Sequence, residues 1–277
     1  MPVHERAYAK LNLILHVGPP RRDGLHPLCS LFASIELADE LYGGPSESGE
    51  DRVECAGVEG RNLVLDAIEA FRNRTGAPPG PVSVRIAKRI PVSAGLGGGS
   101  ADAAAALRIV NRMSDLPLDP AELRELAEEL GSDVPSQVEP AHALVQGVGE
   151  QVERVKLPPL VAVLVHSPKG LSTADVYAEL DRLGGGRGDL DPGPLRRIAS
   201  AAPAELAAAV ENDLEPAALS LRPELRTTLE TLRTSGALGA AVSGSGPSCF
   251  GLFDSSATAE AAAASIPGAL VAALRRG

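Results

Sequence analysis

The feature that most constrains the fold is a glycine-rich segment, residues 91–100 (Pro-Val-Ser-Ala-Gly-Leu-Gly-Gly-Gly-Ser), which stands between two regular elements. Alternating apolar residues over 82–90 predict a strand before it, and the alanine-rich run 101–113 predicts a helix after it. Backbone N–H groups of such a loop can converge, with the positive end of the helix dipole, on an anion. Glycine suits this role because a Cβ would block close approach and positive φ angles. The segment predicts a phosphate-binding loop, and a structural turn is the alternative.

The loop does not match either common nucleotide-binding motif. The sequence Gly-x-x-x-x-Gly-Lys-Ser/Thr is absent, and Gly-x-Gly-x-x-Gly is not satisfied because Ser100 stands where the last glycine would be. Any nucleotide would therefore be held by a different kind of glycine loop.

A second informative segment is residues 7–17, in which side chains alternate with a period of two. This pattern predicts a strand that carries Lys10 and Asn12 on one face. Side chains two residues apart on a strand are separated by about 6.5 to 7 Å, so both could contact one small ligand. Lys10 is one of four lysines in the chain, although an amine at a strand edge is the alternative interpretation.

The remaining pattern mixes helices and strands, which predicts an α+β fold. Helices are expected over 62–74 and 120–130, the latter with Gly131 as its C-terminal cap, and a buried strand over 160–165. Further helices are expected near 195–218, 223–235 and 256–265, with a pair of strands over 240–253. The sequence changes in character near residue 155, where a Pro-Pro pair leads into the apolar run 160–165 and a glycine-rich stretch follows. This change predicts two domains, residues 1–155 and 156–277.

Composition limits the classes of partner. The chain has 277 residues, 44% of them hydrophobic, and a net charge of −10, which disfavours disorder and binding to nucleic acid or anionic lipid. The three cysteines lack zinc spacing, the apolar stretch 160–165 is too short to span a bilayer, and the first residues carry no apolar signal core. We expect a cytoplasmic protein without nucleic-acid or membrane partners, either a monomer or a weak dimer.

Several polar residues have two interpretations from the sequence alone. Asp133 in Gly-Ser-Asp-Val-Pro could act in a site or cap a turn, and His26 could be an ordinary loop histidine. The glycine-rich segment 244–251 fits a turn between two hairpin strands as well as it fits a loop that contacts a ligand. Asp102, in the first turn after the glycine loop, is expected to be structural and directed away from any phosphate.

Three separated segments resemble the signature motifs of the GHMP small-molecule kinases: Lys-Leu-Asn at 10–12, residues 91–100, and Val-Ser-Gly-Ser-Gly-Pro-Ser-Cys-Phe at 242–250. Four others, at 22–26, 61–64, 131–135 and 212–216, are similar to the branch of that family whose substrate carries a cytidine diphosphate. The resemblance implies a two-domain α+β fold, with a ribosomal-protein-S5-like N-terminal domain that binds ATP. It also implies a ferredoxin-like C-terminal domain on the substrate side.

The implied reaction transfers the γ-phosphoryl group of ATP, with Mg²⁺, to the 2-hydroxyl of a cytidine-diphosphate-linked methylerythritol in the non-mevalonate isoprenoid pathway. By resemblance, Asp133 is the catalytic base and Lys10 its partner. The positions implied to bind ATP are Asn62, Lys88, Pro91, Gly95, Leu96, Gly97, Gly98, Gly99 and Ser100. Those implied to bind the acceptor are Asn12, Leu25, His26, Thr173 and Tyr177.

Two details and two alternatives accompany this expectation. Ser100 is the expected protein ligand of Mg²⁺, and Leu25 stands where the family has an aromatic ring against cytosine, which would weaken stacking on the base. One alternative is a kinase for another small alcohol of the mevalonate or homoserine type. The other is a nucleotide-binding member of the fold without catalysis.

Overall fold

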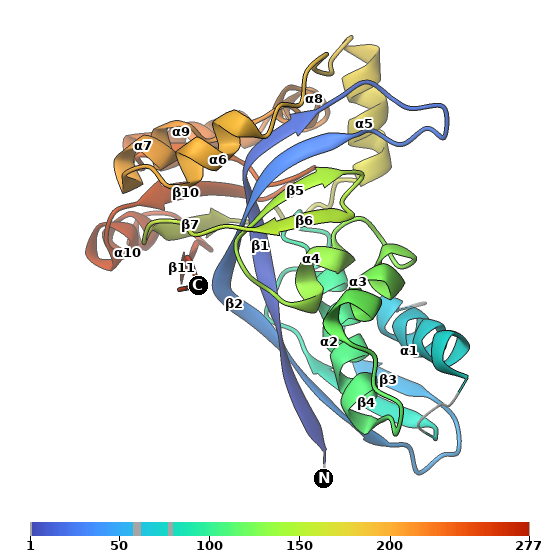
Figure 1. Ribbon diagram of the computed structural model, residues 1–277. Helices are drawn as coiled ribbons and strands as arrows, with labels where there is room; N and C mark the ends of the chain where they lie inside the picture. Colours follow the sequence, from blue (N-terminus) through green and yellow to red (C-terminus); the bar gives the residue numbers. More distant parts are fainter. Residues whose placement is uncertain (1, 58–61, 77–79, 277) are drawn as a thin grey trace. The chain divides into compact units, whose positions relative to one another are not determined.

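The computed structural model describes residues 2–57, 62–76 and 80–276 (Figure 1). Within it the chain forms two compact units. One comprises Met1–Ala9, Leu37–Ile90 and Gly97–Pro140, and the other Lys10–Glu36, Pro91–Leu96 and Ala141–Gly277. Both units are discontinuous in sequence, because the long strands β1 (Val3–Val17) and β2 (Leu28–Pro45) each contribute residues to both. The domain boundary expected near residue 155 stays a prediction.

The first unit is a small sheet covered by helices. Strand β4 (Val82–Ala87) pairs in parallel with β3 (Arg52–Cys55) and antiparallel with the C-terminal part of β2. Its alternating apolar side chains are buried, as the sequence predicts. The helices of this unit are α1 (Leu63–Thr75), α2 (Gly98–Met113), α3 (Pro120–Glu128) and α4 (Val134–Val138). Helix α2 packs against α1 and α4, and one apolar core contains residues from these helices and from β4 (Figure 1).

The predicted helices of this unit are confirmed, with one correction at an end. Helix α1 begins after Asn62, whose side chain accepts a hydrogen bond from the Val64 N–H, and ends at Gly76 in the left-handed conformation. Helix α3 ends at Glu128 with Glu129 as its C-cap, so the predicted cap at Gly131 is wrong. Gly131 has φ 147°, far from the left-handed helical value of about 57°, and its carbonyl instead accepts from the first turn of α4.

The second unit contains the remaining strands. The N-terminal part of β2 pairs antiparallel with β5 (Ala143–Gly147), which pairs with β6 (Gln151–Arg154), and the end of β1 pairs in parallel with the short β8 (Glu211–Asn212). A four-stranded sheet has the order β11-β7-β10-β9. Its strands are β7 (Val161–Val165), β9 (Gly239–Val242), β10 (Cys249–Phe253) and β11 (Leu270–Ala273).

Helices α9 and α10 pack against strands of this four-stranded sheet, and an apolar cluster fills the space between them. The helices of this unit are α5 (Thr173–Arg182), α6 (Gly193–Ala199), α7 (Pro203–Ala208), α8 (Glu215–Leu221), α9 (Leu225–Thr234) and α10 (Ser256–Ala264). The strand predicted at 160–165 and the strand pair predicted over 240–253 are confirmed as β7, β9 and β10. Among the described residues, every helix is too short or too polar to cross a membrane.

Candidate active site

Lys10 and Asn12 meet on one face of β1, as the period-two pattern predicts. The Lys10 Nζ donates to Asn12 Oδ1 at 2.6 Å, and Asn12 Nδ2 donates to Ser30 Oγ at 3.0 Å. Ser30 Oγ in turn donates to the Ile14 carbonyl at 2.7 Å, and the Lys10 ammonium lies 4.7 Å from the centroid of the Phe32 ring. Lys10 and Asn12 are only 5% and 3% exposed. A buried ammonium is thus held by an amide oxygen and an aromatic face, which fixes its direction.

The first part of the glycine-rich segment, residues 91–96, belongs to the same unit. The Lys10 backbone N–H donates to the Leu96 carbonyl at 3.0 Å, and Ser243 Oγ donates to the Gly95 carbonyl at 3.0 Å. Gly95 has φ +72°, and a Cβ there would lie 2.3 Å from the Ser243 carbonyl oxygen. Glycine is therefore required at this position by the protein's own packing, which supports the structural interpretation of this one residue. Pro91, at the start of the segment, is half-buried.

Four other residues that the resemblance assigns to the acceptor, Leu25, His26, Thr173 and Tyr177, also lie in this unit. The rings of His26 and Tyr177 have centroids 4.9 Å apart at an interplanar angle of 43°. His26 Nδ1 donates to the Gly18 carbonyl at 2.9 Å, which places a hydrogen on that nitrogen. The Thr173 hydroxyl lies 2.9 Å from Ser245 Oγ, and Leu25 is 50% exposed. The structure brings His26 and Tyr177 together, and their binding role stays a prediction.

In the first unit, the remainder of the glycine segment opens helix α2. Gly97 is the N-cap with φ 70°, and because it has no side chain it makes no capping hydrogen bond to the first N–H groups of this 16-residue helix. A Cβ on Gly98 would lie 2.9 Å from Ile90 Cγ2, whereas Gly99 is exposed. Ser100 lies in the first turn. Uncapped amides at the positive end of a long helix are suited to an anion such as phosphate.

Lys88 is an ion-paired residue at the same end of α2. Its Nζ donates to Asp39 Oδ2 at 2.6 Å and to Asp102 Oδ2 at 2.8 Å. Burial raises the pKa of Asp102 to about 7 despite the opposing effect of Lys88. Burial alone would lower the pKa of Lys88, but the two carboxylates raise it above its usual value, so the amine stays protonated. Asp102 has the structural role expected of it.

Asp133 and Asn62 belong to this unit as well. Asp133 is the N-cap residue of α4, but its side chain makes no capping hydrogen bond, so helix capping does not account for this carboxylate. Asn62 does cap, as the start of α1 shows. Lys10 and Asp133 belong to different compact units, and their joint action stays a prediction. Arg61, part of one resembling segment, lies outside the described residues.

Sequence reasoning missed several residues that the structure brings to these groups. Asp39 also accepts hydrogen bonds from the Arg89 and Ile90 N–H groups, which fixes the turn before the glycine segment. Ser30 and Phe32 lie on β2, where no strand was predicted. Asn212 was noted as part of a resembling segment without a role, and an isolated buried amide gives no periodic signal. Among the described residues, no group of three His, Cys, Asp or Glu side chains could hold a metal ion.

Comparison with known proteins identifies the family. Residues 62–139 match the model of the GHMP kinases N-terminal domain, and residues 196–272 match that of the GHMP kinases C-terminal domain. A protein of Nocardia farcinica named 4-diphosphocytidyl-2-C-methyl-D-erythritol kinase is 44% identical over 98% of this chain and 91% of its own length. A namesake from Pelotomaculum thermopropionicum is 43% identical, over 91% of this chain and 89% of its own length.

A solved structure of a kinase of the same name is also similar to this chain. The crystal structure of a 4-(cytidine 5'-diphospho)-2C-methyl-D-erythritol kinase has a TM-score of 0.82 and 35% identity, over 99% of this chain and 100% of that one. A homoserine kinase from Cytophaga hutchinsonii shares only the fold, with a TM-score of 0.65 and 18% identity over 99% of this chain and 95% of that one. On its motifs, its fold and these similarities, the chain belongs to the GHMP kinase family.

Proposed function

We propose that this chain uses ATP to phosphorylate the 2-hydroxyl of 4-diphosphocytidyl-2-C-methyl-D-erythritol. The observation that carries the proposal is identity above 40% over nearly the whole chain to kinases of that name. The cluster of Lys10 and Asn12 and the neighbouring rings of His26 and Tyr177 support it, because phosphoryl transfer needs charge beside the acceptor and a cytidine needs stacking surfaces.

Phosphoryl transfer depends on placement and on neutralising charge around the γ-phosphate. In this proposal the uncapped amides of α2 hold phosphate oxygens, Asp133 orients the acceptor hydroxyl and takes its proton, and Lys10 stabilises the negative charge that develops. Asn12 holds the Lys10 ammonium in one direction through its 2.6 Å hydrogen bond. These roles rest on the resemblance of the motifs and on the local geometry within each unit.

Mg²⁺ fits this chain only as an ion coordinated largely by phosphate oxygens. Such binding is usual for Mg²⁺, which keeps several waters and takes few protein ligands, and the described residues offer no acidic cluster for it. Ser100, in the first turn of α2, is the hydroxyl we propose as its protein ligand. The ion would neutralise charge on the transferred group.

The proposed base is tested by Asp133→Asn. We expect kcat to fall at least a hundredfold, because the amide cannot accept the proton of the acceptor hydroxyl, while the Kd for ATP changes less than threefold. ATP consumption is measured with 4-diphosphocytidyl-2-C-methyl-D-erythritol, mevalonate and homoserine side by side, and ATP binding by calorimetry. Near-normal kcat in the variant would refute the base. Equal activity of the wild type on mevalonate or homoserine would refute the substrate.

A further inference from the structure

The turn that follows β9 packs directly against the Lys10–Asn12 pair. Gly244 in this turn has φ +57°, and a Cβ there would lie 3.1 Å from Asn12 Oδ1 and 3.6 Å from Lys10 Nζ. Ser243 Oγ accepts from the Asn12 backbone N–H at 3.4 Å while it donates to the Gly95 carbonyl. A shift of this turn would therefore reach the Asn12 backbone through the Ser243 hydrogen bond.

Asn212 also bonds that turn, through two of its carbonyl groups. Its Nδ2 donates to the Val242 carbonyl at 2.8 Å and to the Gly244 carbonyl at 2.7 Å, and its Oδ1 accepts from the Leu214 N–H at 2.9 Å. The residue is 7% exposed and lies in β8, opposite Leu15 of β1. Both hydrogens of the amide and its oxygen are thus engaged, and each bond fixes a backbone group.

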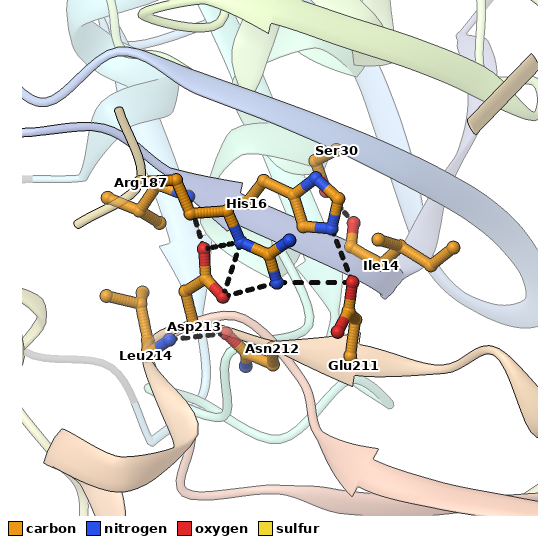
Figure 2. A network of polar contacts seen from close by, with 9 residues as sticks. Ile14, His16, Ser30, Arg187, Glu211, Asn212, Asp213 and Leu214 are labelled. Carbon is orange, nitrogen blue, oxygen red and sulfur yellow. Dashed lines mark hydrogen bonds and ion pairs between the residues drawn. The ribbon is translucent and has the colours of Figure 1, made fainter. Parts of the chain in front are cut away.

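The residues next to Asn212 form hydrogen bonds and ion pairs that hold β1 and the end of β9. Glu215 accepts a hydrogen bond from the Val242 N–H at 2.9 Å, so Val242 is held through both its carbonyl and its N–H. Asp213 accepts from the Val17 N–H at 2.9 Å and pairs with Arg187, which also reaches Glu211 (Figure 2). Strand β1 and the turn after β9 are thereby tied to one short segment, residues 211–215.

We propose that Asn212 is a positioning residue for phosphoryl transfer, acting through the turn at 242–244 on Asn12 and the Lys10 ammonium. The proposal rests on the kinase function proposed above. Its physical basis is that a displacement of about 1 Å in a reacting group can cost a hundredfold in rate, even when the cause lies away from the chemistry. Asn212 itself touches neither reactant in this proposal.

The test is Asn212→Asp, which keeps the size and the acceptor for Leu214 but replaces two donated hydrogen bonds by oxygen facing carbonyl oxygens. We expect kcat to fall at least tenfold, with the KM for ATP within twofold of the wild type. The matched control is Asn111→Asp, because Asn111 also bonds a backbone N–H and a carbonyl, both of Leu118, in the other unit. An equal kcat loss in both variants would overturn the proposal.

A double-mutant cycle separates positioning from general destabilisation. If Asn212 acts through Asn12, Asn212→Asp should add less than threefold to the kcat loss of Asn12→Ala, because coupled residues are not additive. Effects that multiply in full would contradict the proposal. If circular dichroism shows that Asn212→Asp does not fold, Asn212→Ser, which keeps one shorter donor, replaces it in the same cycle. An added kcat loss below threefold again supports the proposal, and effects that multiply in full again contradict it.

A readout without turnover distinguishes this proposal from the proposed function. In the unliganded protein, amide hydrogen exchange at Asn12 should accelerate at least fivefold in Asn212→Asp and not in Asn111→Asp, since the Asn12 N–H bonds Ser243 in the turn that Asn212 holds. Unchanged exchange would overturn the positioning role. A wild type inactive on the cytidine-linked substrate, with exchange accelerated in the variant, would overturn the proposed function and leave the positioning of the Lys10–Asn12 pair standing.

Discussion

Lys88 is a half-buried cation of the first unit, and two buried carboxylates share it. Asp39 is fully buried and Asp102 is 4% exposed, so neither carboxylate can be solvated if the ammonium is lost. A buried charge without its partner is strongly destabilising, whereas an intact group of charges contributes much less than its Coulomb energy suggests. The resemblance assigns Lys88 to ATP binding, whereas its hydrogen bonds in the structure go to Asp39 and Asp102. A role in ATP binding and a role in stability can be separated by measurement.

Lys88→Met should lower the free energy of unfolding by about 3 to 5 kcal/mol, because it leaves Asp39 and Asp102 facing each other without a cation. Urea denaturation at pH 8.5, where Asp102 with its pKa of about 7 is ionised in the wild type, measures this. Adding Asp102→Asn to the variant should restore part of the loss, since one of the two buried charges is then removed. Lys156→Met, at an exposed lysine, is the control and should change stability by less than about 0.5 kcal/mol. A loss in Lys88→Met no larger than in this control would show that the ion pairs contribute nothing.

At the scale of elements, local rules were sufficient where an element has an alternating sequence or a clear end. The sequence of β1 alternates, although residues 9–17 are all buried, so the meeting of Lys10 and Asn12 on one face followed from the sequence. Strand β2 was missed because its buried residues include consecutive apolar ones, among them Leu31, Phe32 and Ala33, so its sequence lacks the period-two alternation of β1. Its buried polar residues, among them Ser30 and Asp39, further interrupt the apolar pattern.

The start of α1 offers a prediction at this scale. Asn62→Ala should cost about 1 kcal/mol in the free energy of unfolding, because the Val64 N–H loses its acceptor, whereas Asn62→Ser should keep most of it. Thermal and urea unfolding measure the difference. If Asn62 also contacts ATP, both variants should raise the KM for ATP to a similar extent. Equal stability of the two variants would exclude the capping role.

At the scale of the whole molecule, the chain reaches its two compact units by crossing between them several times. The end of the chain is fixed in the second unit by His142, which is 2% exposed. Its Nδ1 accepts from the Ser34 N–H at 3.1 Å, and its Nε2 donates to the Arg275 carbonyl at 2.6 Å. This pair of bonds requires the neutral imidazole, and burial, together with the Arg275 charge, lowers the pKa of His142 below its usual value.

The sign of the resulting pH dependence follows from that lowered pKa. Below about pH 6.5 this imidazole becomes protonated in the unfolded chain but stays neutral in the folded chain, which favours unfolding. The contribution of neutral His142 to folding stability is therefore complete above about pH 6.5 and is lost as the pH falls toward the pKa of His142 in the folded protein. We expect the free energy of unfolding to drop more between pH 7.5 and 5.5 in the wild type than in His142→Gln. Urea titrations at both pH values compare them. Identical drops would exclude His142 as a contributor.

By itself, the sequence determined the features that depend on residues close together in the chain. These are the alternation of β1, the helix expected over 62–74, the glycine segment that opens α2, and the motifs that indicated the family. Only the tertiary structure decided which buried polar groups meet. Lys88 bonds Asp39 across 49 residues and Asn212 bonds Val242 across 30. Burial makes an unpaired polar group costly, so each of these groups must find a partner, but the path of the chain chooses which one, and that choice leaves no periodic trace in the sequence.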